Sequence, residues 1–200
     1  CILNDWSSRD IQTWEYQPLG PFLAKNFAST ISPWIVTLEA LAPYRTHVFQ
    51  RPAGDPEPLA YLTNAAHTAV GSLDINLEVA VATEAMRENG DVPQVIGSPN
   101  FKNMYWTIFQ MFAHHTSNGC DFNPGDFYGT GTISGTGKDE CGSILEVCKG
   151  GKETIDFPSG EHRTFLEDGD EVVMRAWCEA EEKPRVGFGD CRSVIISADS

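Results

Sequence analysis

The first thirty residues contain an unusual density of side chains that could act on a small anionic substrate. Asp5 offers a carboxylate, the kind of ligand that hard cations such as Ca²⁺ and Mg²⁺ prefer. Arg9 and Gln12 are three residues apart, so in a helix they lie on one face, and Lys25 follows them. Fixed hydrogen-bond donors of this kind stabilise developing negative charge. The stretch therefore indicates one wall of a candidate anion-stabilising site.

The same spacing also fits a purely structural arrangement, in which these residues neither bind a ligand nor take part in catalysis. Asp5 would then cap the following helix, and the nearby cations would pair on the surface with Asp10 and Glu15. Residue types and spacing alone leave both arrangements open.

A second candidate is the glycine-rich stretch GTGTISGTG, residues 129–137. Glycine lets backbone amides approach a ligand closely, and Thr132 and Ser134 add hydroxyl groups. No Gly-Lys-Ser/Thr follows it and no βαβ unit surrounds it, so it is neither a nucleotide-triphosphate loop nor a dinucleotide fingerprint. By itself the stretch favours a tight turn.

Two further features involve ionisable groups. His114 and His115 are adjacent, so in a helix their side chains point about 100° apart and do not easily face one ion. Their position favours a helix C-terminus, where the dipole suits a cation. Glu146 lies inside the apolar run GSILEV. A partly buried carboxylate needs a partner, and orienting a histidine is one such role; the solvent face of an edge strand is the alternative.

Composition restricts the classes of partner. The 200 residues carry a net charge of −14, which argues against nucleic acid and anionic membrane surfaces as partners. The longest apolar runs are too short to span a bilayer. The six cysteines contain no CxxC pair, which favours reduced thiols, a cytoplasmic location and no thiolate metal site. The chain begins without Met, in an apolar stub, and we expect a fragment of a longer polypeptide.

The elements that must position these side chains are mostly strands. A short helix is predicted from Ser7 or Ser8 to about Glu15, with Ile11 and Trp14 on its inner side. TISPWIVTL, residues 30–38, reads as an edge or kinked strand because of its proline. Strict alternation over residues 73–83 predicts a half-buried strand. A hairpin turn and return strand follow over 86–97, and residues 166–177 and 184–191 look like paired strands.

One long helix is predicted in the middle of the chain. It starts at Ser98 or Asn100, carries apolar residues at helical spacing, and ends at Asn118-Gly119. Residues 45–72 read as a surface excursion with one short strand near Tyr61. The fold class expected is α+β, predominantly β, with residues 1–200 forming a single, partial domain that is truncated at its N-terminus.

The motifs, taken together, resemble the fumarylacetoacetate hydrolase family. The resemblance rests on NDWSSRDIQTWEYQPLGPFLAKNFASTISPW, NFKNMYWTIFQMFAHHTSNGC, NPGDFYGTGTISG, GSILE, DGDEV and GFGDC, in the family's order. It implies a mixed β-sandwich roll, a homodimer, and bound Ca²⁺ and Mg²⁺. It also implies hydrolysis of a carbon–carbon bond in 4-fumarylacetoacetate, the last step of tyrosine and phenylalanine breakdown.

The resemblance assigns roles to residues of the first motif. Asp5 matches a ligand of the active-site metal, and Lys25 and Ser29 match positions at a second metal, where the family has threonine in place of this serine. Arg9, Gln12 and Lys25 match the group that stabilises the carbanion or enolate leaving group.

Further roles fall on the remaining motifs. Gln12, Tyr16, Gly131 and Thr132 match substrate-binding positions, and Glu146 matches the carboxylate that orients the catalytic histidine. The resemblance places that histidine, a substrate arginine and three more acidic ligands upstream of this chain. Two other readings remain: a related acylpyruvate hydrolase, decarboxylase or hydratase, and a non-catalytic chain that only dimerises or binds a ligand.

Overall fold

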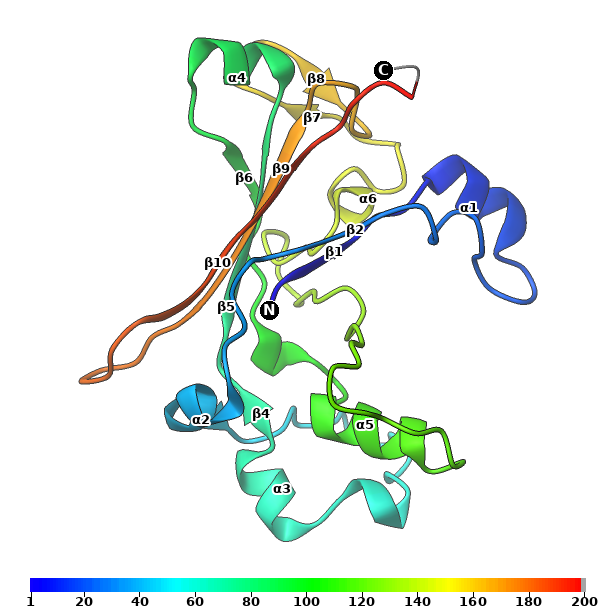
Figure 1. Ribbon diagram of the computed structural model, residues 1–200, viewed down its shortest axis with the longest axis vertical. Coiled ribbons are helices and arrows are strands. Elements are labelled where there is room, and N and C mark those ends of the chain that lie inside the picture. The colour runs from blue at the N-terminus through cyan, green and yellow to red at the C-terminus, as the bar shows by residue number, and fades with distance from the viewer. Residues whose placement is uncertain (199–200) are drawn as a thin grey trace.

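The protein, described by a computed structural model over residues 1–198, is a strand-rich mixed α/β chain (Figure 1). Its centre is a four-stranded antiparallel sheet with strand order β10-β9-β5-β6. In the view of Figure 1 the sheet runs diagonally. The strands are β5 (Asn76–Ala82), β6 (Gln94–Gly97), β9 (Glu171–Cys178) and β10 (Val186–Val194).

Alternating apolar residues explain why β5 occupies the centre of this sheet. Val79 and Val81 are buried on one face, as the sequence pattern predicts, and Ala80 is buried on the other. β5 pairs with β9 in the register Ala80↔Val173. The predicted pairing of the last two strands is confirmed as well, since β9 and β10 are antiparallel neighbours.

Three two-stranded sheets and several short helices complete the chain. The pairs are β1 (Leu3–Asp5) with β2 (Ser29–Ile31), β3 (Arg45–Thr46) with β4 (Ser72–Leu73), and β7 (Ile155–Asp156) with β8 (His162–Arg163). The α-helices are α1 (Arg9–Glu15), α2 (Leu38–Leu41), α3 (Ala65–Val70), α4 (Glu84–Asn89), α5 (Ile108–Thr116) and α6 (Ile144–Val147). The 3₁₀ turns are η1 (Ala42–Tyr44), η2 (Ala60–Leu62) and η3 (Phe101–Asn103). In Figure 1 α4, β7 and β8 lie at the upper end of the central sheet, and β1, β2, α1 and α6 lie beside its middle.

The prediction of one long helix is wrong. The segment forms the single turn η3 and then, after a break, the separate helix α5. Tyr105 and Trp106 lie in the break, where both rings pack against the guanidinium of Arg51, at 4.5 and 4.2 Å from its central carbon. Thr107 then starts a new helix through a capping box with Gln110. Tertiary contacts and a second cap thus override the continuous helical spacing.

Three smaller predictions are also corrected. The helix starting after Ser8 is confirmed, but Ile11 and Trp14 are not on an inner side, since they are 40% and 88% exposed. The residues near Tyr61 form η2 rather than a strand. The predicted hairpin turn after β5 is instead α4, capped by Thr83, although the return strand β6 is confirmed.

The β1–β2 pair is tied to the edge of the central sheet through Thr30. The indole Nε1 of Trp6 donates to Thr30 Oγ1 at 3.0 Å, and the Ser193 hydroxyl of β10 donates to the same oxygen at 2.9 Å. The Cys191 thiol donates to the Thr30 carbonyl at 3.4 Å. These contacts fix the strand end that carries Asp5.

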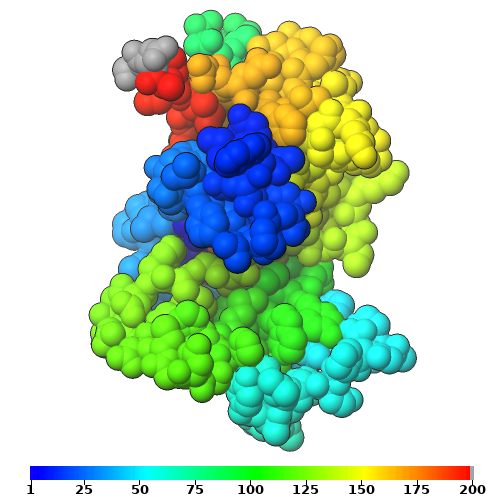
Figure 2. All heavy atoms as spheres, turned by 90° about the vertical axis from the view of Figure 1, so that its right-hand side faces the viewer, coloured from blue at the N-terminus to red at the C-terminus, as the bar shows by residue number. Residues whose placement is uncertain are grey.

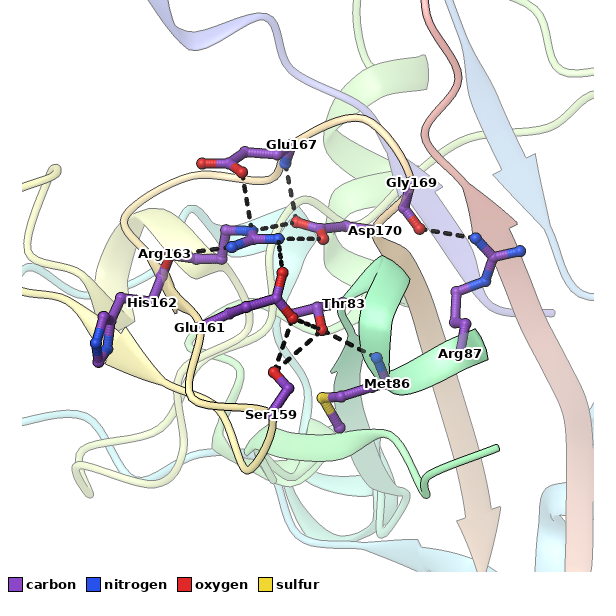
Figure 3. A network of polar contacts seen from close by, with 10 residues as sticks. All are labelled: Thr83, Met86, Arg87, Ser159, Glu161, His162, Arg163, Glu167, Gly169 and Asp170. Carbon is purple, nitrogen blue, oxygen red and sulfur yellow. Dashed lines mark hydrogen bonds and ion pairs between the residues drawn. The ribbon is translucent and has the colours of Figure 1, made fainter. Parts of the chain in front are cut away.

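A buried polar network holds the β7–β8 pair against the far end of the sheet (Figure 3). The Arg163 guanidinium contacts both oxygens of the Asp170 carboxylate, at 2.9 and 3.0 Å. It also donates to Glu161 at 3.1 Å, and Glu161 accepts from Thr83 at the end of β5. Asp170 is fully buried and Arg163 is 7% exposed, so the hydrogen bonds between the two charged groups must replace those that each would make with water.

A close backbone approach joins the loop after the glycine-rich stretch to β6. A Cβ added at Gly97 would lie 1.9 Å from the Cys141 carbonyl oxygen, so only glycine fits there. We expect Gly97→Ala to lower the free energy of unfolding by about 1–3 kcal/mol, because the strand and the loop must separate. Urea denaturation measures this change. Gly187→Ala is the matched control, since its added Cβ meets nothing within 4 Å; an equal loss in both variants would contradict the steric explanation.

The six cysteine thiols are unpaired with one another, and Cys148, Cys178 and Cys191 are buried. Within residues 1–198 no helix combines the length and apolar character needed to cross a membrane.

Candidate functional site

An open cleft of about 1750 Å³ separates the N-terminal segment from one face of the central sheet. In Figure 2 the N-terminal segment, in blue, lies toward the viewer beside the yellow segment that contains α6. Polar side chains of the N-terminal segment and the glycine-rich loop line part of the cleft, and apolar side chains of β5, β9 and neighbouring segments line much of the rest. The cleft thus combines a polar wall with an apolar floor.

Lys25 and Asp5 form the central ion pair of the polar wall. The Lys25 ammonium donates to Asp5 Oδ2 at 2.9 Å and to the Asp5 carbonyl at 3.0 Å. The Lys25 side chain is 28% exposed and that of Asp5 is 52% exposed. Ser29 lies directly opposite Asp5 in the β1–β2 register. The strand pair therefore brings Asp5 close to Lys25 and Ser29, which lie much later in the sequence.

Glu15, at the end of α1, holds the loop that carries Lys25. Its carboxylate accepts backbone N–H groups from Phe22, Leu23 and Ala24 at 2.7, 3.2 and 2.8 Å. The hydrogen bond from Ala24 is the largest of the causes that lower the pKa of Glu15 below its ordinary value. The loop is therefore folded around an ionised carboxylate, immediately before Lys25.

We expect Glu15→Ala to raise amide hydrogen exchange at residues 22–24 about tenfold or more, because three charge-assisted bonds are lost. Amide hydrogen exchange measured for each residue tests this prediction. Because the folded pKa is lowered, the stabilisation is present at neutral pH and is lost as the pH falls through that pKa. Gly20, whose N–H is bonded to the Tyr16 carbonyl, provides the internal control. Unchanged exchange at 22–24 would contradict the role of Glu15.

Arg9 and Gln12 form a second donor pair on α1. Arg9 Nη1 donates to Gln12 Oε1 at 2.7 Å, which leaves the Gln12 amide nitrogen available as a donor. Burial lowers the pKa of Arg9, and the carboxylates of Glu146 and Asp5 act in the opposite direction. The guanidinium therefore lies within electrostatic reach of two anionic groups, as expected at a charged site.

Glu146 fixes the glycine-rich loop to α6. Its Oε2 accepts from the Ser134 hydroxyl at 3.0 Å and from the Ser143 hydroxyl at 2.7 Å. A Cβ at Gly142 would lie 2.1 Å from the Ile133 carbonyl oxygen, so the loop closes tightly on itself. Gly131 has φ +78°, a left-handed conformation that glycine adopts readily. Thr132 is presented from this rigid turn.

The structure brings most of the sequence-predicted site residues to the cleft. Tyr16 and Glu146 are not among the residues that line it: Tyr16 is 45% exposed at the end of α1, and Glu146 bonds to the two serines. The chemical roles assigned to all of these residues stay predictions. The predicted residues that line the cleft are Asp5, Arg9, Gln12, Lys25, Ser29, Gly131 and Thr132.

Neither simple surface pairing nor capping by Asp5 is observed. Ser8 rather than Asp5 occupies the N-cap position of α1. Asp10 accepts from the Ser8 hydroxyl and Glu15 binds backbone amides, so neither pairs with Arg9 or Lys25. Sequence reasoning missed the supporting roles of Glu15, Thr30, Ser134 and Ser143, because their bonds to backbone amides or to side chains elsewhere in the chain leave no local spacing pattern.

The described residues do not by themselves make a divalent-cation site. Within residues 1–198 there is no group of three or more His, Cys, Asp or Glu side chains placed to hold an ion. Ca²⁺ takes six to eight oxygen ligands, whereas the cleft wall offers the Asp5 carboxylate, already paired with Lys25, and the Ser29 hydroxyl. A cation here would need further ligands from outside these residues.

Comparisons with known proteins identify the family. A family model described as "Fumarylacetoacetate (FAA) hydrolase C-terminal" matches residues 1–196. The chain is 46% identical to the fumarylacetoacetase of Dictyostelium discoideum over 200 residues, 47% to that of Rattus norvegicus over 197, and 48% to that of Caenorhabditis elegans over 199. The matches cover 98–99% of this chain but 44% of each relative, so the chain spans less than half of their length. The chain belongs to the fumarylacetoacetate hydrolase family and corresponds to its C-terminal part.

Proposed function

We propose that this chain forms part of a fumarylacetoacetase, which hydrolyses a carbon–carbon bond of 4-fumarylacetoacetate to give fumarate and acetoacetate. The observation that carries the proposal is the match along almost the whole chain to proteins of that name. The position of Lys25, Arg9 and Gln12 on one cleft wall supports it, because the reaction needs donors at a developing negative charge.

The chemistry follows from the cleavage step. Breaking the bond by hydrolysis leaves its electron pair on the acetoacetate fragment, as an enolate. In the proposal the Lys25 ammonium and the Arg9 guanidinium hold the enolate oxygen, and Gln12, Tyr16, Gly131 and Thr132 bind the remaining polar groups of the substrate. Asp5 keeps Lys25 oriented before substrate binds, since their contact is 2.9 Å. Fixed donors need little reorganisation during reaction.

Water activation requires a group beyond the described cleft. None of the described residues that line it is a histidine, since His114 and His115, on α5, are not among the lining residues. We propose that Glu146 orients a base supplied from outside residues 1–198. In the same way, we propose that Asp5, Lys25 and Ser29 contribute to the Ca²⁺ and Mg²⁺ sites expected from the family, together with additional ligands from elsewhere.

The remaining proposals concern assembly and context. We propose a homodimer, supported by the large apolar side chains exposed around α1 and the following loop. We also propose a cytoplasmic place in tyrosine and phenylalanine breakdown, and a β-sandwich roll for the complete domain. The exposed side chains are Trp14 at 88%, Leu19 at 81%, Phe22 at 56% and Leu23 at 64%.

The loss of fumarylacetoacetate absorbance, measured with the protein expressed from its complete reading frame, tests the proposed reaction. We expect turnover with equimolar fumarate and acetoacetate as products. Turnover of acylpyruvates instead would place the protein with the related hydrolases and decarboxylases. Binding without turnover of either substrate would show a non-catalytic protein and overturn the proposal.

A further inference from the structure

The turn after α5 brings a thiol against an imidazole outside the lining of the cleft. Cys120 Sγ lies 3.1 Å from His115 Nε2, and both residues are exposed. The turn is well defined: the Gly119 N–H is bonded to the Thr116 carbonyl and Gly119 has φ +88°. The Cys120 N–H donates to Asn118 Oδ1 at 3.2 Å. The sulfur is therefore held beside the ring by the local backbone.

Aromatic side chains support the imidazole. The centroid of the Phe122 ring lies 4.9 Å from the centroid of the His115 ring. It lies 4.8 Å from the ring centroid of Phe112 and 5.3 Å from that of Tyr128. Tyr128 also lines the cleft. The cluster leaves one edge of the imidazole directed at the thiol and provides apolar surface beside it, which suits a small, partly apolar reactant.

The other five thiols lack this combination. Burial raises the pKa of Cys178 to about 11 and also raises the pKa of Cys191. Burial, with Glu146 and Asp139, raises the pKa of Cys141. Cys148 is buried, and Cys1, although exposed, has no imidazole contact among the described residues.

We propose that Cys120 and His115 form a reactive thiol–imidazole pair that takes up conjugated carbonyl electrophiles by covalent addition at sulfur. His115 accepts the thiol proton, and the thiolate forms a carbon–sulfur bond at the β-carbon of the electrophile. The π electrons move to the α-carbon, which takes a proton back from the imidazolium, so no oxidant or other reactant is needed. The negative end of the α5 dipole lies beside His115, and the Asp121 carboxylate follows Cys120 in the sequence.

This site does not depend on the proposed hydrolase function. The fumaryl group of the proposed substrate is itself a conjugated carbonyl, so it belongs to the class that the pair would capture. Hydrolysis and capture use different residues, however, and each is measured separately.

The test is the rate of N-ethylmaleimide addition at each cysteine of the folded protein at pH 7, followed by peptide mass spectrometry. A free thiol is only a few per cent ionised at this pH, so we expect Cys120 to react about tenfold faster than Cys1. His115→Gln should lower the Cys120 rate about tenfold and leave the Cys1 rate unchanged.

The matched control is His114→Gln, which removes the adjacent imidazole. That ring stacks on Tyr61 and accepts or donates one hydrogen bond with its hydroxyl, rather than contacting the thiol. The His114→Gln variant should leave the rate of addition at Cys120 unchanged, and Asp121→Asn should raise that rate. Equal Cys120 rates in the wild type and His115→Gln, or an equal loss in His114→Gln, would overturn the proposal.

Discussion

Replacing Arg163 by Met is expected to lower the free energy of unfolding by about 3–5 kcal/mol, because it leaves the Asp170 carboxylate buried without its cation. Asp170 has no exposed surface and takes two guanidinium contacts, at 2.9 and 3.0 Å (Figure 3). For a chain of this length the loss corresponds to a fall in melting temperature of about 10 °C. Calorimetry and urea denaturation both measure it.

Two further variants distinguish the effect of leaving a buried charge unpaired from a general disruption of this region. Arg87→Met removes a guanidinium that donates only to the Gly169 carbonyl at an exposed position, and it should cost much less. Arg163→Met combined with Asp170→Leu removes both charges and should recover part of the loss. A loss below about 1 kcal/mol in the single variant would show that Asp170 is neutral or hydrated in the fold.

Lys25→Met is expected to lower kcat about 100- to 1,000-fold in the complete enzyme, the usual effect of removing one donor from a developing oxyanion. The KM should change little, since the contact strengthens only in the transition state. Steady-state kinetics with fumarylacetoacetate measures both constants. The prediction depends on the proposed function and on the position of Lys25 in the cleft wall.

Lys102→Met is the matched control for Lys25. Lys102 also pairs with an aspartate, Asp74 at 3.2 Å, but neither residue lines the cleft. The Lys102→Met variant should leave kcat nearly unchanged. If Lys25→Met raises only KM, or if both variants lose activity equally, Lys25 does not stabilise the transition state.

Elements with strong local patterns were predictable from the sequence. The alternation of β5, the serine before α1 and the pairing of β9 with β10 are all properties of short stretches. The long helix was not: the capping box of Thr107 and Gln110 starts α5 anew, and the two aromatic rings before it pack against Arg51, a residue remote in the sequence. The exposure of Trp14 likewise depends on whether another part of the chain packs against α1. The spacing of apolar residues within the helix does not indicate this.

The candidate site was predictable only through the family motifs. Spacing alone did not distinguish Asp5 and Lys25 from ordinary surface residues, because they are 20 positions apart and meet only when β1 pairs with β2. Glu15 carried no signal at all, since a carboxylate that binds backbone amides resembles any charged residue at a helix end. Tyr16 and Glu146 were assigned by motif position, yet neither is among the residues lining the cleft.

The pairing registers join residues that lie at very different separations along the chain. Asp5 and Ser29 are partners across a short loop, whereas Ala82 and Glu171 of the central sheet are partners across a far longer one. Closing the longer loop costs only about 1 kcal/mol more, because loop entropy grows with the logarithm of length. Non-local pairing nevertheless slows folding. The pairing of β5 with β9 is therefore expected to form later than the N-terminal strand pair and the β9–β10 hairpin, whose partners Cys178 and Val186 are joined by a short turn.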